Sequence, residues 1–270
     1  MNIFKLYTRA RYGLIVLGSV MLLACGGGGG GEPGDSGTPR ILSLNHAGYN
    51  SVTHTYQYGY NSISNITVTG EPDDTDWSRY AMLHDGEVYR LYFFRTGSND
   101  TLYQFAYNPN TAVFEYGYRS IPTLRITGMP ADADPSSFAM LHDGSDYRLY
   151  MRSTSNPARI YQSAFNRTTN RYEYGYHSIA VIDVTGAPAD VDWDRWEMLY
   201  DGQTYRHYAM RRNSTTELYQ FGFNASAGDY QYGYRSIPTL RVENMPAGSD
   251  PGNFGMLHDG RDYHYYALAL

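Results

Sequence analysis

Three histidines recur at one equivalent place in the chain and are the first candidates for chemistry. His84, His142 and His258 each precede an Asp-Gly pair, and Tyr200 takes the same place in a further copy. Imidazoles arranged around an axis could hold a metal ion. A histidine beside a turn could instead cap that turn, and repetition favours this structural role. The sequence thus raises an axial metal site and a capping role as alternatives.

The copies differ most in one segment, and a single site would need such an asymmetry. The third copy alone has Trp196, Glu197 and Tyr200, and Trp193 precedes them. Glu197 stands where the other copies have alanine or glycine, so its carboxylate could hold a cation in a central tunnel or could meet Arg195 and water. We therefore take these aromatic and acidic side chains as candidate ligand-binding residues. They are also where an enzyme acting on polysaccharide or peptide would have its site.

Arginine and tyrosine supply a second set of candidates. Arg90, Arg148 and Arg206 occupy equivalent positions, each two residues before a tyrosine. Stacking on tyrosine and bidentate hydrogen bonds from arginine are suited to glycans or acidic polymers. The alternative is that most of the 29 tyrosines simply fill the space between repeats. A serine is also repeated, but without a His-Asp partner, so we expect no catalytic nucleophile.

The elements that position these residues are repeats of 58 residues. One motif, Tyr-Gly-Tyr-x-Ser-Ile, and a second, Met-Leu-His/Tyr-Asp-Gly, keep the same offset through four copies. The glycines of the first motif are Gly59, Gly117, Gly175 and Gly233, and those of the second are Gly86, Gly144, Gly202 and Gly260. Two motifs in fixed register over four copies predict a four-repeat architecture.

The second copy shows what one repeat contains. Residues 137–143 form a short apolar run that ends in Asp-Gly, a hairpin signal. Residues 147–152 and 159–166 alternate between two kinds of side chain, which is typical of strands with one buried face. Residues 171–176 return as a further strand, and 178–194 are expected to connect to the next repeat. Each repeat should thus hold about four antiparallel strands and no helix.

Four-stranded units repeated about an axis predict an all-β fold, a four-bladed β-propeller. The last copy ends after its second strand, and the chain begins with the missing third and fourth strands at 44–50 and 55–60. The folded part, 41–270, has 230 residues, close to four periods. We therefore expect the N-terminal strands to complete the C-terminal blade, which closes the ring and removes both free sheet edges.

The repeat resembles the hemopexin-like four-bladed propellers. The resemblance rests on an inner strand with small residues (Phe138 to Met140), on Gly117-Tyr118 and Ile121, and on Gly128-Met129-Pro130 before the next inner strand. It implies a shared architecture. The sequence departs from the family in its longer period, its permuted ring and its single cysteine, which excludes the disulfide between first and last blades, so no ligand is carried over from the family. We expect no cofactor, with an axial cation as the open alternative.

The N-terminus has the features of an export signal. Lys5, Arg9 and Arg11 precede a short apolar segment, and Leu22 to Cys25 resembles the lipobox of bacterial lipoproteins. The resemblance implies that 1–24 is a signal peptide and that Cys25 becomes the lipidated, palmitate-bearing N-terminus. Residues 25–40 are expected to form a glycine-rich flexible tether. The residue after Cys25 is glycine, which resembles the outer-membrane sorting pattern.

Charge excludes one class of partner. The net charge is −6 and becomes −9 once the three cations of residues 1–24 are removed, and no lysine remains. Nucleic acid is therefore not an expected partner. The sequence predicts a lipoprotein of the outer membrane that acts as a binding module for a protein or glycan at the bacterial cell envelope. An enzyme and a purely structural envelope protein are the alternatives, and the face of the membrane is left open.

Overall fold

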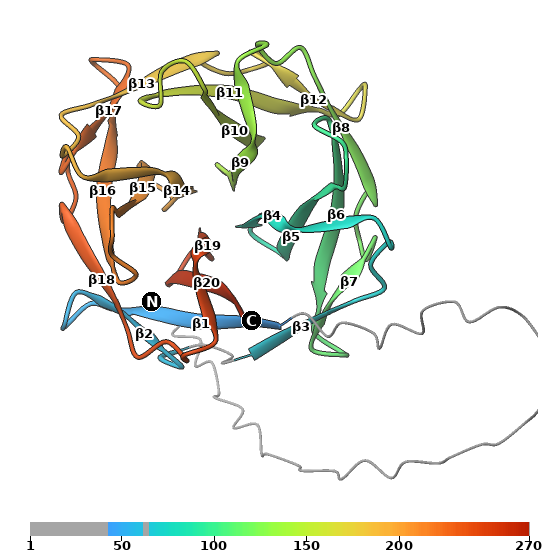
Figure 1. Cartoon of the computed structure of the whole chain (residues 1–270). Helices are drawn as coiled ribbons and strands as arrows, with labels where there is room; N and C mark the ends of the chain where they lie inside the picture. The colour runs from blue at the N-terminus through green and yellow to red at the C-terminus, as the bar shows by residue number, and fades with distance from the viewer. Residues whose placement is uncertain (1–42, 62–64, 270) are drawn as a thin grey trace, which may run out of the picture. The chain divides into compact units, whose positions relative to one another are not determined.

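The computed structural model describes residues 43–61 and 65–269. Its regular elements in these ranges are twenty β-strands, which pair into one ring-like sheet (Figure 1). The described residues contain no helix, and hence none long and apolar enough to cross a membrane. The expected signal peptide, Cys25 and the glycine-rich tether lie outside the described residues.

The strands fall into five kinds, one of each kind in every repeat. The first strands are β4 (Thr75–His84), β9 (Ala133–His142), β14 (Val191–Tyr200) and β19 (Ser249–His258). The second are β5 (Tyr89–Arg95), β10 (Tyr147–Ser153), β15 (Tyr205–Arg211) and β20 (Tyr263–Ala269). The third are β1 (Ser43–Asn50), β6 (Thr101–Asn108), β11 (Arg159–Asn166) and β16 (Glu217–Asn224). The fourth are β2 (Thr55–Tyr58), β7 (Val113–Tyr116), β12 (Arg171–Tyr174) and β17 (Asp229–Tyr232). The fifth are β3 (Asn65–Thr69), β8 (Thr123–Thr127), β13 (Val181–Thr185) and β18 (Thr239–Glu243).

Strands of the first four kinds form antiparallel groups, as the alternating sequence predicts. In one group β4 pairs with β5, β5 with β6, and β6 with β7. The segment expected to be a plain connection contains the fifth strand. β8 pairs antiparallel with β6 and parallel with β12 of the next group. It therefore ties each group to its neighbour through backbone hydrogen bonds.

The two ends of the described chain meet in one group. β1 pairs antiparallel with β20, and β18 pairs parallel with β2. The pairing of β1 with β20 is the one that the complementary ends of the repeat predict, and it leaves no gap between the last group and the first (Figure 1). The first strands β4, β9, β14 and β19 contact one another around the centre of the ring.

The core lies between neighbouring groups. Four clusters of buried side chains fill these junctions; one of them joins Met82 and Phe93 of one group to Leu257 and Tyr266 of the adjoining group. Tyrosine provides much of this bulk, and rings such as Tyr265 and Tyr266 are almost fully buried. For these rings the space-filling role that the sequence offered is the one observed.

Candidate functional site: three equivalent pockets between neighbouring groups

Three pockets of one design lie at three of the junctions between groups. We name them after the arginine in each: the Arg90 pocket, with a volume of about 340 Å³, the Arg148 pocket, about 260 Å³, and the Arg206 pocket, about 320 Å³. In each, one wall comes from the second and third strands of a group and the opposite wall from the next group. The structure thus places each of the three predicted arginines in its own pocket.

The arginine is held rigidly from two sides. Arg90 Nε donates to Asp85 Oδ2 at 2.5 Å, and Arg90 Nη1 donates to the carbonyl oxygen of Arg119 at 3.2 Å. Arg148 and Arg206 repeat both bonds, to Asp143 and Asp201 and to the carbonyl oxygens of the matching loop residues. Held in this way, the guanidinium group has a fixed direction before any ligand arrives, which reduces the entropy lost on binding.

The aspartate is itself fully engaged. Burial would raise the pKa of Asp85, but hydrogen bonds from the backbone N–H of Val88 and from Arg90 lower this pKa to about 2. Tyr147, from the next group, donates its hydroxyl to Asp85 Oδ2 at 2.9 Å. Tyr205 and Tyr263 do the same to Asp143 and Asp201. The turn aspartate therefore connects the arginine of one wall to the tyrosine of the other.

A glutamine and two phenols form the polar floor. Gln104, with its amide oxygen turned towards the arginine, accepts from Tyr92 Oη at 2.9 Å and from Arg90 Nη1 at 3.2 Å. Tyr92 also shares a hydrogen bond with Tyr172 of the next group, and burial raises the pKa of both phenols. Both hydroxyls therefore stay protonated at physiological pH. Gln162 with Tyr150, and Gln220 with Tyr208, occupy the equivalent places.

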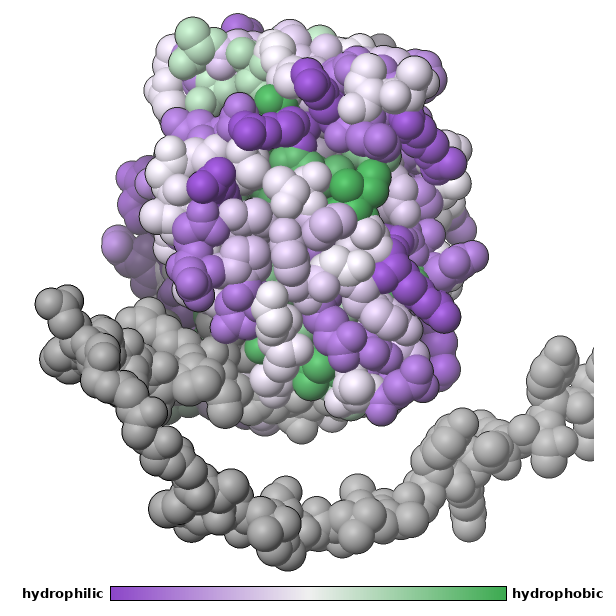
Figure 2. Space-filling view, turned by 90° about the vertical axis from the view of Figure 1, so that its right-hand side faces the viewer, coloured by the Kyte–Doolittle hydropathy of each residue, from purple (hydrophilic) through white to green (hydrophobic). Residues whose placement is uncertain are grey.

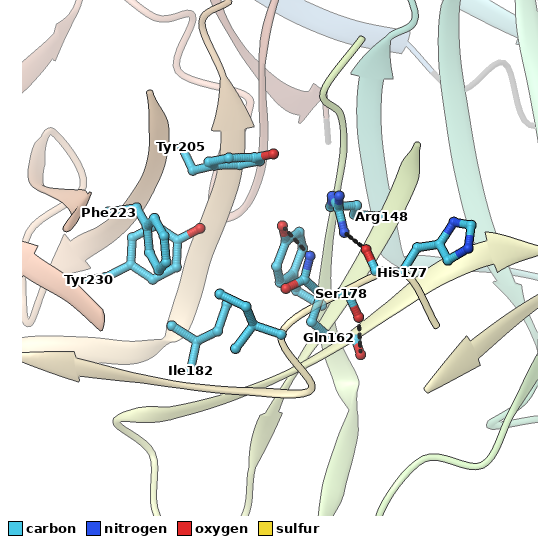
Figure 3. Close-up of a pocket in the computed structure, with 10 residues that line it drawn as sticks. Arg148, Gln162, His177, Ser178, Ile182, Tyr205, Phe223 and Tyr230 are labelled. Atoms are coloured by element: carbon cyan, nitrogen blue, oxygen red, sulfur yellow. Dashed lines mark hydrogen bonds between the residues drawn. The ribbon is translucent and has the colours of Figure 1, made fainter. Parts of the chain in front are cut away.

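The opposite wall is aromatic and the rim is apolar. Figure 3 shows Tyr205, Phe223 and Tyr230 facing Arg148 and Gln162 across the Arg148 pocket. At the rim of the three pockets the side chains of Ile121, Ile179 and Ile237 are 38%, 49% and 36% exposed. They make up three of the five large apolar side chains that are exposed in the described ranges. The outer face shown in Figure 2 is mostly hydrophilic, with apolar side chains gathered in a few small spots.

The fourth junction differs at the positions of the arginine and the glutamine. His264 and His46 stand there, and His46 Nε2 lies 2.8 Å from His264 Nδ1. His264 Nε2 lies 3.0 Å from Asp259 Oδ2, and the His46 ring stacks on Tyr266. The polar groups of this junction are thus bonded to one another.

The structure places the three histidines and Tyr200 around the axis, and two of the histidines cap turns. His84, His142, Tyr200 and His258 line one end of the ring's central axis, around a space of only about 10 Å³. The Nδ1 atoms of His84 and His258 accept the backbone N–H of Gly86 and Gly260, both at 3.3 Å. Burial lowers the pKa of all three histidines. Within the described residues no group of three His, Cys, Asp or Glu side chains is placed to hold a metal ion.

The asymmetric segment of the third repeat does not form one cleft. Trp196 and Glu197 line a space of about 80 Å³ at one end of the axis, whereas Tyr200 lies at the other end. Trp193 packs instead against Phe221. Glu197 is 1% exposed, and burial raises its pKa well above the usual range, which favours the neutral acid. Arg195 pairs with Asp192, not with Glu197, which corrects the ion pair that the sequence suggested.

Sequence reasoning missed most of the pocket. It singled out the arginines but not the glutamine, the rim isoleucine or the aromatic wall. A usable signal was present for two of these: a glutamine recurs in the middle of an otherwise apolar strand at 104, 162 and 220, and an isoleucine closes every Tyr-Gly-Tyr motif. The wall comes from the next repeat, so it follows only from the packing of neighbouring groups.

Comparison with known proteins gives weak structural likenesses. No protein-family model matches the sequence, and no curated protein matches it. AofleA from Arthrobotrys oligospora is similar over 85% of this chain and 66% of its own, with 12% identity and a TM-score of 0.35. A mutant of Aleuria aurantia lectin in complex with alpha-methyl-L-fucoside is similar over 80% of this chain and 67% of its own, with 13% identity and a TM-score of 0.36. SapL1 lectin in complex with alpha methyl fucoside is similar over 79% of this chain and 67% of its own, with 10% identity and a TM-score of 0.31. The chain thus spans about two thirds of each of these structures, and the function has to be argued from the pockets themselves.

Proposed function

We propose that this chain is a glycan-binding module whose three pockets each take one sugar unit. The observation that carries the proposal is the threefold repetition of one pocket: a fixed arginine, an amide and phenols on one side, aromatic rings on the other. Sugars present hydroxyls that need closely spaced donors and acceptors, and C–H faces that pack on aromatic rings. A buried network of this kind repeated three times is more than the packing of a junction requires.

Size and surface favour a glycan over a protein partner. Pocket volumes of 260–340 Å³ lie at the lower end for ligand sites, which suits a single small ring. A stable protein interface needs about 800 Å² from each partner. The exposed isoleucines are instead single residues, one beside each pocket. Three like sites on one chain also give a branched or repeated glycan an avidity that one site lacks.

The architecture and location that we propose follow the sequence. The four groups are the blades of a four-bladed β-propeller, related in design to the hemopexin-like propellers. Cys25 carries the lipid, and residues 25–40 give the ring reach from a bacterial outer membrane. Replacing Cys25 with serine should abolish incorporation of labelled palmitate into the chain, and incorporation that persists would contradict the lipid anchor.

A glycan array probed with the full chain tests the binding function. Its matched variants place aspartate at all three rim isoleucines, Ile121, Ile179 and Ile237, or at Val52 alone. Val52 is 86% exposed in the turn after β1 and lines none of the three pockets. Binding that survives at Val52→Asp but is lost in the triple variant supports the proposal.

Two other array results would reject the proposal. No binding of any glycan would leave the structural envelope protein as the better reading. Released products on the array would favour the enzyme, and Glu197→Ala would then have to abolish their release.

A further inference from the structure

One position at the rim of each pocket departs from what its backbone prefers. Arg119, His177 and Arg235 follow the second tyrosine of the repeated motif, and their φ angles are 44°, 46° and 47°. Glycine and asparagine adopt this left-handed region at little cost, and the remaining copy of the motif does have Asn61 there, with φ 45°. Three repeats thus keep a large basic or aromatic side chain where a small one would be less strained.

These rim side chains differ in charge between pockets. Arg119 stacks over Tyr118 with its guanidinium carbon 5.5 Å from the ring centre, and Arg235 stacks over Tyr234 at 5.4 Å. No ion pair holds either arginine within the described part of the chain. In the Arg148 pocket the position is His177, stacked on Tyr176 with the rings 4.0 Å apart.

The rim cation is not cancelled from within the pocket. The residues that line the Arg90 and Arg206 pockets include two arginines each and no acid. The inner one, Arg90, is compensated by Asp85, and Arg206 by Asp201. Each of these two pockets therefore has one uncompensated positive charge at its rim, although the whole chain is acidic.

A second difference separates the same pockets. The rim loop continues with Pro122 in the Arg90 pocket and with Pro238 in the Arg206 pocket, but with Ala180 in the Arg148 pocket. Ser120 Oγ and Ser236 Oγ are buried there without a hydrogen-bond partner in the described structure, whereas Ser178 Oγ donates to the carbonyl oxygen of Gln162 at 3.5 Å. Loop sequence, charge and unpaired hydroxyls thus divide the pockets into the same two classes.

From these observations we infer that the Arg90 and Arg206 pockets select glycans with a carboxylate on the unit next to the pocketed sugar. The Arg148 pocket has no such selection. The inference rests on the glycan-binding function proposed above. Figure 3 shows the ring of His177 turned away from the pocket interior, so this position meets what extends from the pocketed unit and not the unit itself. A planar guanidinium without an ion pair at that place matches a carboxylate in both charge and shape.

The test uses the full chain and pairs of oligosaccharides that differ only in having a uronic acid or its neutral hexose beside the terminal unit. We expect two sites per chain to bind the acidic member about fivefold more tightly, the size of one exposed ion pair. This preference should fall when salt is raised from about 0.05 M to about 0.5 M, because exposed charges are screened. The third site should bind both members alike at either salt concentration.

Two variants separate charge from structure. Arg119→Gln with Arg235→Gln should remove the acidic preference, measured as the ratio of the affinities for the acidic and the neutral member of each pair. His177→Arg should create a third acid-preferring site, a gain that a merely structural rim residue would not give. Equal affinity for both members of every pair, or a preference that survives in the glutamine variant, overturns the inference alone. Absence of binding for every sugar overturns the proposed function and this inference with it.

Discussion

His46 and His264 join the two ends of the described chain by a hydrogen bond buried inside the ring. Nε2 of His46, on β1, lies 2.8 Å from Nδ1 of His264, on β20, and neither side chain is more than 5% exposed. They occupy the places that glutamine and arginine hold at the other three junctions. At this junction a bond between two histidines therefore takes the place of the arginine and glutamine of the three pockets.

This bond should couple the closing strands energetically. Replacing either histidine with alanine leaves the other one buried with a lost partner, so each single variant should lower the free energy of unfolding by about 1–3 kcal/mol. A double-mutant cycle by urea denaturation should give a coupling of at least about 0.5 kcal/mol, because the residues are in direct contact. Strictly additive losses would show that the bond does not stabilise the closure.

The repeat also predicts how the fourth junction could be given the arginine and glutamine of the other three. His46→Gln with His264→Arg would place an arginine beside Asp259, as Arg90 stands beside Asp85. The double variant should therefore be more stable than either single variant, by about 1 kcal/mol or more. A thermal melt compares the three chains, and a double variant no better than the weaker single one would contradict the equivalence of the junctions.

Buried His207 should make the protein sensitive to acid. It is 0% exposed, neither ring nitrogen has a hydrogen-bond partner in the described residues, and burial, with Arg152 nearby, lowers its pKa to about 3. The unfolded chain takes up this proton near pH 6.5 and the folded chain does not. Between about pH 6.5 and 3 the histidine thus lowers stability by about 1.4 kcal/mol per unit of acidification.

The equivalent residues Leu91 and Leu149 indicate the variant to make. His207→Leu should be more stable than the native chain at pH 7, by about 1–3 kcal/mol, because no unpaired imidazole remains buried. Its advantage should grow as the pH falls towards 4.5. Urea denaturation at both pH values measures this, with the exposed His54→Asn as control. An advantage that stays constant with pH would mean that His207 is protonated in the fold.

Glu197 should give a pH dependence of the opposite sign. Burial raises its folded pKa well above the usual range, so the folded state keeps a proton that the unfolded chain loses near pH 4.3. Its contribution to stability is present at low pH and is lost as the pH rises towards the folded pKa. Glu197→Gln should therefore gain stability relative to the native chain as the pH rises above about 4.3. A difference that is flat over this range would show an ionised Glu197.

The turn aspartate should support both fold and pocket. Asp85→Asn removes the negative charge that accepts hydrogen bonds from Arg90 Nε at 2.5 Å and from the Tyr147 hydroxyl at 2.9 Å. Because the Asp85–Arg90 pair is partly solvated, its loss should lower the free energy of unfolding by about 2 kcal/mol. The native chain should lose the same contribution between about pH 4 and 2, because the folded pKa is lowered to about 2. A variant as stable as the native chain at pH 7 would contradict the clamp.

Much of the fold could be predicted because each strand carries its own signal. Period-two alternation and the Asp-Gly turns predict the first four strands of each repeat, and the unfinished last copy predicts the pairing of β1 with β20. The fifth strand was missed although the side chains of Thr123–Thr127 alternate between exposed and buried, because only five residues lie between two turns and such a short segment also suits a connection. Its pairing with the next group makes it a strand, and no local pattern reveals that partner.

The candidate site was harder to predict from the sequence, because part of it also comes from the next group. Three arginines at equal spacing were visible, but the wall that faces Arg148 comes from Tyr205 and Phe223, one repeat further on. The aromatic and acidic segment at Trp196 and Glu197 was visible too, because it breaks the repeat. Asymmetry there reflects an unusual core and axis position, with both side chains at most 3% exposed.

A crystal structure of the full chain, grown with the glycan that binds it most tightly, is the most direct test of the central claim. The account predicts a sugar ring against the aromatic wall in the Arg90, Arg148 and Arg206 pockets, with its hydroxyls bonded to the guanidinium group and the rim isoleucine alongside. A glycan bound at either end of the axis or on the outer face, with these three pockets empty, would contradict it.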